Sequence, residues 1–307
     1  MLPVVSVIIP TYNRWPMIAE AVESVLEQGY GSFEIIVVDD GSTDGTKERL
    51  KKYGSSVLVI SRQRSGVAAS RNYGVSVAQG RYLAFLDSDD LWLPQKLTIQ
   101  TTFMEQHPEV KICQTEEIWI RGGVKVNPKA KHAKPSGDIF RRSLDFCLVS
   151  PSAVMMTRNL LDQFGGFDES FPVCEDYDLW LRIAKDHAIP LIPKPLVVKR
   201  GGHADQLSHS TWGMDRYRVQ SLRNLLRNGL LGEKRNWVLE ALHRKIFILS
   251  QGATKRGKQD EAAAYKAILA EFLQENLDAG DGDSSIRRKP GVSSADAGAV
   301  VGLASVG

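Results

Sequence analysis

The stretch Leu83-Ala84-Phe85-Leu86-Asp87-Ser88-Asp89-Asp90 organises the rest of the chain. Its first half is a short apolar run, which is typical of a buried strand. Its second half carries three carboxylates in four positions, and clustered anions are unfavourable unless a positive group joins them. If the backbone stays extended, the side chains of Asp87 and Asp89 point the same way. Oxygen ligands in this arrangement suit Mg2+ or Mn2+ holding phosphate oxygens.

The same stretch also has a purely structural interpretation, a strand followed by a helix. Ser88 or Asp89 would then cap the helix, and the acids would meet the positive end of the helix dipole. The stretch alone leaves both interpretations open. The surrounding sequence favours the first.

Strand and helix patterns alternate in the sequence before this stretch. Runs rich in β-branched residues at Val4–Ile9, Phe33–Val38 and Val57–Ile60 predict strands. Between them, Ile18–Leu26 has apolar residues at helical spacing, and Thr46–Tyr53 predicts a short helix. The β-α-β-α-β order implies a parallel sheet with right-handed crossovers, and therefore an α/β fold.

Polar residues follow three of the predicted strands. They are Thr11-Tyr12, Asp39-Asp40 and Asp87-Ser88-Asp89. In sheets of this kind ligands bind outside the carboxyl ends of the strands. Helix capping alone does not readily explain polar groups at the ends of three separate strands, so the sequence predicts a binding site at this edge.

Two predicted helices begin with charges that helix formation alone does not require. Arg71 lies in the first turns of the helix after Gly66, where a cation gains nothing from the dipole, so it either binds an anion or is a solvated surface arginine. Glu175 and Asp176 stand at the start of the helix that continues from Tyr177. Acids there suit the dipole, but a carboxylate in a cleft beside other carboxylates can also acquire the raised pKa of a general base.

The segment from Leu91 is predicted to start a helix that ends near His107. Strand patterns follow at Ile112–Gln114, Ile118–Ile120, Ser150–Met156 and Leu191–Val198. The prolines of the last segment favour an edge position in the sheet. The basic segment Lys125–Lys134 is interpreted either as a solvated loop or as a lid over an acceptor.

The composition changes after residue 205. Helices are predicted at Met214–Arg227, Trp237–Leu249 and Ala262–Leu277, the last two as an αα-hairpin. We therefore expect three parts: a ligand-binding domain over residues 1–205, a helical extension over 206–278, and a disordered tail over 279–307, which lacks a periodic apolar face.

Length and composition indicate an ordinary globular protein of 307 residues, with 43% hydrophobic and 24% charged residues. The formal net charge of +3 gives no case for a nucleic-acid partner. Three widely spaced cysteines suggest a reducing compartment. Without a signal-peptide pattern or an apolar run of about 18–20 residues, we expect a cytoplasmic protein. The basic helix Met214–Arg227 leaves peripheral contact with the inner face of the membrane open.

Six blocks of the sequence form one recognisable set: Val5–Arg14, Val37–Thr46, Gly66–Gly74, Leu83–Trp92, Gly165–Glu169 and Glu175–Arg182. Together they resemble the family 2 glycosyltransferases of the GT-A fold. They stand in that family's order and extend over about residues 4–205. The resemblance implies a GT-A (Rossmann-like), mostly parallel sheet flanked by helices. It also implies inverting transfer of a sugar from a nucleotide diphosphate donor, most often a UDP-sugar, to a hydroxyl of a saccharide or glycolipid acceptor.

The resemblance also implies roles for the residues of the donor site. Thr11, or Pro10 beside it, together with Tyr12 and Asp39, would hold the nucleobase and ribose. The remaining donor-site residues would be Arg14, Arg71, Asp87 and Ser88, with Arg71 at the diphosphate.

For the reacting centre, the resemblance implies a metal held by a D-x-D pair, with Asp89 as a ligand and Asp87 at the metal or the ribose. A bound cation would neutralise the charge that develops on the leaving diphosphate. Asp176 would be the base, with Glu175 beside it orienting the acceptor or a loop. His203 falls where some members place a histidine that contacts phosphate or metal.

Two other functions remain alternatives. A sugar nucleotidyltransferase should carry a glycine-rich loop for a triphosphate where this chain has Pro10–Arg14, which contains no glycine. A non-catalytic binding protein of the same fold would not need the intact acids Asp87, Asp89 and Asp176. By analogy with the family, we expect a role in the assembly of cell-surface polysaccharide or glycoconjugate.

Overall fold

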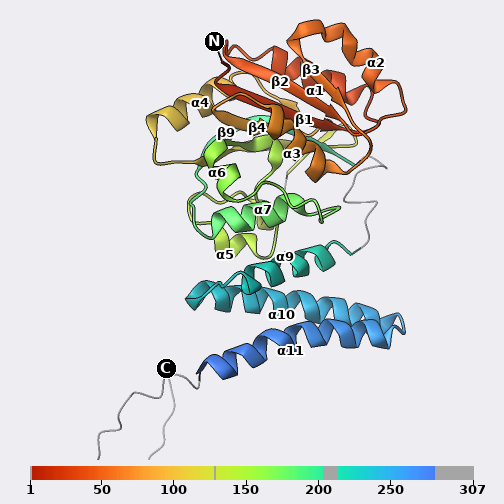
Figure 1. Cartoon of the computed structure of the whole chain (residues 1–307), viewed down its shortest axis with the longest axis vertical. Coiled ribbons are helices and arrows are strands. Elements are labelled where there is room, and N and C mark those ends of the chain that lie inside the picture. Colours follow the sequence, from red (N-terminus) through yellow and green to blue (C-terminus); the bar gives the residue numbers. More distant parts are fainter. Residues whose placement is uncertain (1, 128, 203–212, 281–307) are drawn as a thin grey trace, which may run out of the picture.

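The computed structural model describes residues 2–127, 129–202 and 213–280, with side chains described up to Phe272 (Figure 1). His203 and the part of the predicted tail from residue 281 therefore lie outside the described residues. Figure 1 shows the sheet and its helices at one end of the molecule and three C-terminal helices at the other. None of the helices described is both long and apolar enough to cross a membrane.

Among the described residues, nine strands form one sheet in the order β3-β2-β1-β4-β8-β6-β9-β5, with β7 paired to β6. Strands β1 to β4 are parallel to their neighbours within this group, whereas β8 runs antiparallel to both β4 and β6. The strands are β1 (Val5–Thr11), β2 (Phe33–Asp39), β3 (Leu58–Ser61), β4 (Tyr82–Phe85), β5 (Leu91–Trp92), β6 (Ile112–Arg121), β7 (Val124–Val126), β8 (Val154–Thr157) and β9 (Leu191–Gly201). The predicted parallel sheet is thus confirmed for its first four strands, and the later strands make the whole sheet mixed.

The helices lie between and beyond these strands. They are α1 (Met17–Leu26), α2 (Thr46–Leu50), α3 (Val67–Val77), α4 (Lys96–Gln106), α5 (Phe140–Ser143), α6 (Arg158–Gln163), α7 (Glu175–Ala184), α9 (Asp215–Arg227), α10 (Gly232–Lys255) and α11 (Gln259–Gly280). The predicted C-terminal helices are confirmed, and α10 begins before the predicted Trp237 and continues beyond Leu249.

Different helices cover the two faces of the sheet because β1 is apolar on both sides. Val7 and Ile9 pack with Ile18 of α1 on one face, whereas Ile8 belongs to the cluster on the other face. Gly74 lets α3 approach that second face closely, since a Cβ there would lie 2.5 Å from a methyl carbon of Ile8. The close packing brings the start of α3, which carries Arg71, to the end of the sheet.

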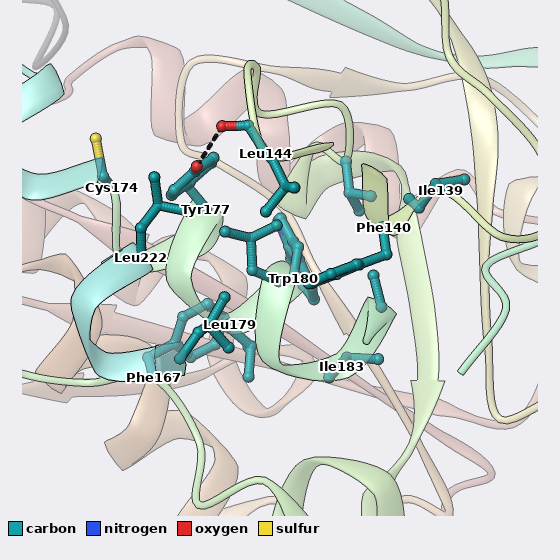
Figure 2. Packing of buried hydrophobic residues seen from close by; sticks show 14 of the residues in the cluster. Ile139, Phe140, Leu144, Phe167, Cys174, Tyr177, Leu179, Trp180, Ile183 and Leu222 are labelled. Atoms are coloured by element: carbon teal, nitrogen blue, oxygen red, sulfur yellow. Dashed lines mark hydrogen bonds between the residues drawn. The ribbon is translucent and has the colours of Figure 1, made fainter. Parts of the chain in front are cut away.

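Helix α7 is anchored by its apolar side. Figure 2 shows Tyr177 and Trp180 of this helix packed in a cluster with Phe140 and Phe167. The Tyr177 hydroxyl donates a hydrogen bond to the carbonyl oxygen of Leu144 at 2.7 Å. This packing fixes the first turn of α7, which carries Glu175 and Asp176.

The C-terminal helices share this same core. Leu222 of α9, Leu242 of α10 and Phe272 of α11 belong to one buried cluster with Phe140 and Trp180. Helices α10 and α11 pack along each other as the predicted hairpin (Figure 1). The extension therefore rests directly on the helix that carries the predicted base.

The helix predicted from Leu91 is wrong at its start. Leu91 and Trp92 form the short strand β5, which pairs with Val198 and Val197 of β9, and α4 begins only at Lys96. Pro94 cannot donate a backbone hydrogen bond, and Gln95 has φ of 69°, so a continuous helix is broken at both residues. The capping interpretation of Ser88 or Asp89 is wrong for the same reason, since no helix follows them directly.

The edge position predicted for Leu191–Val198 is wrong at the end of that segment, where Val197 and Val198 of β9 pair with β5 on the side away from β6. The register of β6 and β9 shifts on both sides of Glu116, opposite the segment that contains Pro193 and Pro195. The irregularity places the prolines where regular pairing is interrupted, and β5 covers the segment after them.

The basic segment Lys125–Lys134 is not solvated throughout. The Lys134 side chain is buried, with its ammonium nitrogen 2.9 Å from the Glu117 carboxylate, and it donates to the carbonyl oxygen of Thr115 at 3.1 Å. Burial alone would raise the pKa of Glu117, but the charges of Lys134 and Lys199 lower it to about 2. The end of this segment is therefore held against β6 by the contacts of Lys134 with Glu117 and Thr115.

Acid should weaken this attachment. A carboxyl whose pKa is lower in the folded chain stabilises the fold above its unfolded pKa and loses that contribution as pH falls. We expect Glu117 to account for about 3 kcal/mol of the decrease in unfolding free energy between pH 6 and pH 2. Urea unfolding across this range should show a shallower pH dependence for Glu117→Gln than for the wild type. The exposed control Glu109→Gln should keep the wild-type slope, and an unchanged slope in Glu117→Gln would contradict the assignment.

Candidate active site

A cleft of about 1160 Å³ opens where β1 and β4 end and α3 and α7 begin. The structure brings most of the predicted site residues to this cleft, although they come from separate parts of the chain. Those that line it are Pro10, Thr11, Tyr12, Arg14, Arg71, Asp87, Ser88, Asp89, Glu175 and Asp176. The carboxyl edge of the sheet is thus hollowed where the sequence predicts a binding site.

The acids after β4 form a tight turn. The backbone N–H of Asp90 donates to the carbonyl oxygen of Asp87 at 3.0 Å. The buried Asp90 carboxylate accepts hydrogen bonds from the Ser152 hydroxyl at 2.6 Å and from the backbone N–H of Arg200 at 2.9 Å. Burial raises the pKa of Asp90 to about 8. Asp90 therefore ties the turn to β9, while Asp87 and Asp89 face the cleft.

Asp87 and Asp89 are suited to a cation. Burial and the charge of Asp87 raise the pKa of Asp89, and the charges of Arg14 and Lys199 offset only part of this. Among the residues that the structure describes, no group of three or more His, Cys, Asp or Glu side chains is placed to hold a metal by itself. Because Mg2+ is commonly bound by one or two carboxylates together with substrate phosphates and water, the pair fits a cation that binds with a diphosphate.

Arg71 lies between two carboxylates rather than in solvent. Its guanidinium nitrogens are 2.7 Å from Asp87 and 2.6 Å from Glu175, and its side chain is 4% exposed. Burial alone would lower the pKa of Arg71, but Asp87 and Glu175 raise it. The solvated interpretation of Arg71 is therefore wrong, and its predicted contact with a diphosphate stays a prediction. The observed ion pairs join α3, the acid turn and α7.

The first turn of α7 presents two acids in different surroundings. Cys174, in the left-handed conformation with φ of 65°, precedes the helix and turns the chain toward the cleft. Glu175 is buried against Arg71; burial and the charge of Asp176 raise its pKa, and Arg71 opposes that shift. Asp176 accepts hydrogen bonds from the backbone N–H of Tyr177 at 2.7 Å and from the thiol of Cys147 at 3.3 Å.

A third acid in this turn serves the fold. Asp178 is buried and accepts a hydrogen bond from Arg182 at 2.7 Å, one helical turn later. Arg182 also donates to the carbonyl oxygen of Gly166 at 2.8 Å and so ties α7 to the preceding loop. Asp178 therefore has a structural role, whereas Glu175 and Asp176 line the cleft.

Of the residues predicted at the nucleobase end, Pro10, Thr11 and Tyr12 line the cleft, and the nucleobase contact of Asp39 stays a prediction. The predicted nucleobase contact Asp39 is buried, accepts from the backbone N–H of Ser42 at 3.0 Å and the hydroxyl of Ser61 at 3.3 Å, and is not among the described residues that line the cleft. Its neighbour Asp40 lines the cleft and receives the backbone N–H groups of Ser65 and Gly66 at 2.8 and 2.9 Å. The two carboxylates brace the loops after β2 and β3.

The Tyr12 side chain gives the cleft an aromatic surface near the loops after β2 and β3. The guanidinium carbon of Arg64 lies 3.9 Å from the centre of the Tyr12 ring, and Arg64 donates to the Tyr12 hydroxyl at 3.0 Å. Both residues line the cleft. Arg64 is a cleft residue that the sequence analysis missed.

Lys199 and Arg200 of β9 were also missed. The ammonium group of Lys199 donates to the Ser150 hydroxyl at 2.9 Å, and Arg200 donates to the backbone carbonyl of Asp89. Burial alone would lower the pKa of Lys199, but the carboxylates of Glu117, Asp90 and Asp87 raise it. Both residues line the cleft near the end of their strand. A search for polar residues after each predicted strand would therefore have identified them as well.

Comparison with known proteins identifies related chains. The model of the family "Glycosyl transferase family 2" matches residues 6–163. An uncharacterized glycosyltransferase of Rickettsia felis is 37% identical over 200 residues, which are 62% of this chain and 32% of that protein. The chain thus spans about a third of the length of this relative. The Escherichia coli protein WfgD, named UDP-Glc:alpha-D-GlcNAc-diphosphoundecaprenol beta-1,3-glucosyltransferase, is 34% identical over 61% of this chain and 72% of its own.

Solved structures share the fold. Crystalline S. aureus TarS 1-349 in complex with UDP-GlcNAc has a TM-score of 0.61 and 18% identity, over 90% of this chain and 92% of that one. The mannosyltransferase PcManGT of Pyrobaculum calidifontis, in complex with GDP-Man and Mn2+, also has a TM-score of 0.61, with 21% identity over 92% and 82% of the two chains. These likenesses confirm the predicted GT-A fold with C-terminal helices.

Proposed function

Because this chain belongs to glycosyl transferase family 2, we propose that it moves a sugar from a nucleotide diphosphate donor to an acceptor hydroxyl, with inversion at the anomeric carbon. The observation that carries the proposal is the convergence of Tyr12, the Asp87–Asp89 turn and Asp176 on one cleft. In the proposed reaction these residues would supply an aromatic contact, oxygen ligands for a cation and a carboxylate base.

The donor half of the cleft would bind the nucleotide. Tyr12 would contact the nucleobase, and the backbone around Pro10 and Thr11 would border the ribose. Arg14 and Arg71 line the same cleft, and Arg71 contacts Asp87 of the acid turn, so both guanidinium groups would bind the diphosphate. The turn would hold Mg2+ or Mn2+ through Asp89 and Asp87, and such a cation supplies charge neutralisation for the departing diphosphate. The proposed metal contact of His203 remains a prediction from the sequence.

Asp176 would act as the general base. As the acceptor oxygen attacks the anomeric carbon from the face opposite the diphosphate, the new C–O bond forms, the C–O bond to the diphosphate breaks, and the hydroxyl proton passes to Asp176. A single displacement of this kind inverts the anomeric centre, and it needs no second carboxylate as nucleophile. Glu175, held by Arg71, would position the first turn of α7 rather than take the proton.

For the substrates, we propose a UDP-sugar and a lipid-linked saccharide. Support comes from the name of WfgD, which specifies a UDP-Glc donor and a diphosphoundecaprenol-linked acceptor, and from the UDP-GlcNAc complex of TarS. Such an acceptor would place the protein at the cytoplasmic face of the membrane, in the assembly of cell-surface polysaccharide or glycoconjugate.

Thermal stabilisation by a panel of nucleotide sugars, each with Mn2+ or EDTA, tests the proposal. We expect one UDP-sugar to raise Tm in Mn2+, since a ligand at a hundred times its Kd adds about 2.7 kcal/mol to the unfolding free energy. EDTA should abolish this shift, and Asp89→Ala should abolish it in Mn2+ as well. The control Asp162→Ala, at an exposed position of α6, should behave as the wild type.

Two outcomes would argue against the proposal. Equal stabilisation in EDTA and Mn2+ would remove the metal from the donor site. Pyrophosphate release from a nucleoside triphosphate and a sugar phosphate would indicate a nucleotidyltransferase instead.

A further inference from the structure

We propose that Cys147 is a positioning residue for the proposed base: its thiol holds one oxygen of Asp176 so that the carboxylate faces the acceptor. The inference rests on the proposed function, in which Asp176 takes the acceptor proton. It concerns a residue between α5 and β8, well away in sequence from the blocks that suggest the enzyme's class.

The geometry fixes the carboxylate at both oxygens. Oδ1 of Asp176 accepts the backbone N–H of Tyr177 at 2.7 Å, and Oδ2 accepts the thiol of Cys147 at 3.3 Å. The first contact comes from α7 itself, and the second comes from a segment that packs against the α7 core. Rotation of the carboxylate about its last bond therefore breaks at least one hydrogen bond.

The thiol has a second acceptor. Sγ of Cys147 also lies 3.3 Å from the carbonyl oxygen of Val149. A thiol has one proton, and an ionised carboxylate attracts it more strongly than a neutral carbonyl does. The S–H group can thus point to Asp176 while the base is ionised and turn to Val149 once the base has taken a proton.

The chemistry of sulfur suits this position. A hydroxyl would bond the carboxylate more strongly and stabilise its charged form, which lowers its basicity, whereas a thiol is a weak donor. Burial and the charge of Asp176 raise the pKa of Cys147 well above its ordinary value, so the group stays a neutral donor. Cys147 can therefore orient the base at little cost to its proton affinity.

Other charged groups face Asp176 from the surrounding elements. Arg71 of α3 and Lys199 of β9 contribute positive charge, and Glu175 contributes negative charge from the same turn. Cys174 stands before the helix, with Arg218 of α9 near both thiols. Changes at Cys147 leave all of these charges in place, so its effect on the pH profile can be measured against a constant background.

The test compares Cys147→Ser and Cys147→Ala in the full chain, using the sugar nucleotide identified by the panel. For Cys147→Ser we expect the acidic limb of the kcat profile to move about one pH unit lower, because the hydroxyl stabilises the charged base. For Cys147→Ala we expect kcat to fall about tenfold with the donor KM unchanged, because the base loses its orientation. The control Cys113→Ala, in the buried core away from the cleft, should lower Tm without moving the acidic limb.

The outcomes separate this inference from the proposed function. If both Cys147 variants keep the wild-type limb and kcat while Asp176→Asn is inactive, Cys147 does not position the base. If Asp176→Asn retains turnover, the base assignment itself is wrong. A drop in Tm with unchanged kinetics in both Cys147 variants would show a packing role and overturn the inference.

Discussion

Replacing Asp176 with asparagine is expected to reduce kcat by about 10³-fold and to leave the donor Kd unchanged. The amide has nearly the shape of the carboxylate and can keep the hydrogen bond from Tyr177, but it cannot accept the acceptor's proton. A positioned general base commonly contributes factors of about 10²–10⁴. Steady-state release of the nucleoside diphosphate gives kcat, and calorimetry with the unreacted donor gives Kd.

A matched surface change separates loss of the base from a general effect on the enzyme. Asp186 follows α7 and is half-exposed beside Lys185, so Asp186→Asn should retain wild-type kcat. Turnover in Asp176→Asn within tenfold of the wild type would assign proton removal to another group. A large loss of donor affinity would instead place Asp176 in the donor half of the cleft.

Replacing Arg71 with leucine should be the most damaging change to stability. The side chain neutralises both Asp87 and Glu175, and Glu175 is 6% exposed. Removing one partner of a buried ion pair leaves an uncompensated charge, which typically costs about 3–5 kcal/mol. Urea unfolding at pH 7 should show a decrease of this size in the free energy of unfolding.

The exposed pair Lys52–Glu23 provides the comparison, because both its side chains are about half exposed. Lys52→Met should leave the unfolding free energy close to the wild-type value, because exposed ion pairs contribute little. The double variant Arg71→Leu/Glu175→Gln should recover part of the loss, since the buried carboxylate is no longer left unpaired. A loss at Arg71 no larger than at Lys52 would mean that water or another cation neutralises the two acids.

The sequence predicted the features that depend on local pattern. The strands before the acid turn, the helix starting at Glu175 and the polar ends of separate strands are encoded by nearby residues, and the family prediction that they supported is confirmed. The features that failed depend on pairing between distant segments. Leu91 and Trp92 become a strand only because Val197 and Val198 are available to pair with them.

The sequence also did not predict which groups pair with individual charged side chains. Neighbouring residues do not reveal that Arg71 contacts Glu175, or that Asp40 rather than Asp39 borders the cleft, because these positions depend on partners that lie far away in the sequence. Lys134 looked solvated because it stands among other lysines, and its buried partner Glu117 lies on a different element. Metal dependence and inversion remain proposals that rest on this arrangement.

The core shared by α7 and the C-terminal helices limits where segments of this chain can be exchanged with those of its relatives. A chimera joined near residue 205 would separate Leu222 and Leu242 from a buried cluster that also contains Phe140 and Trp180. Grafting α9 to α11 from a relative would therefore disturb the helix bearing Asp176, even though the transplanted segment contains none of the proposed reacting groups. A chimera that keeps this core intact should therefore transfer α5 and α7 together with α9 to α11.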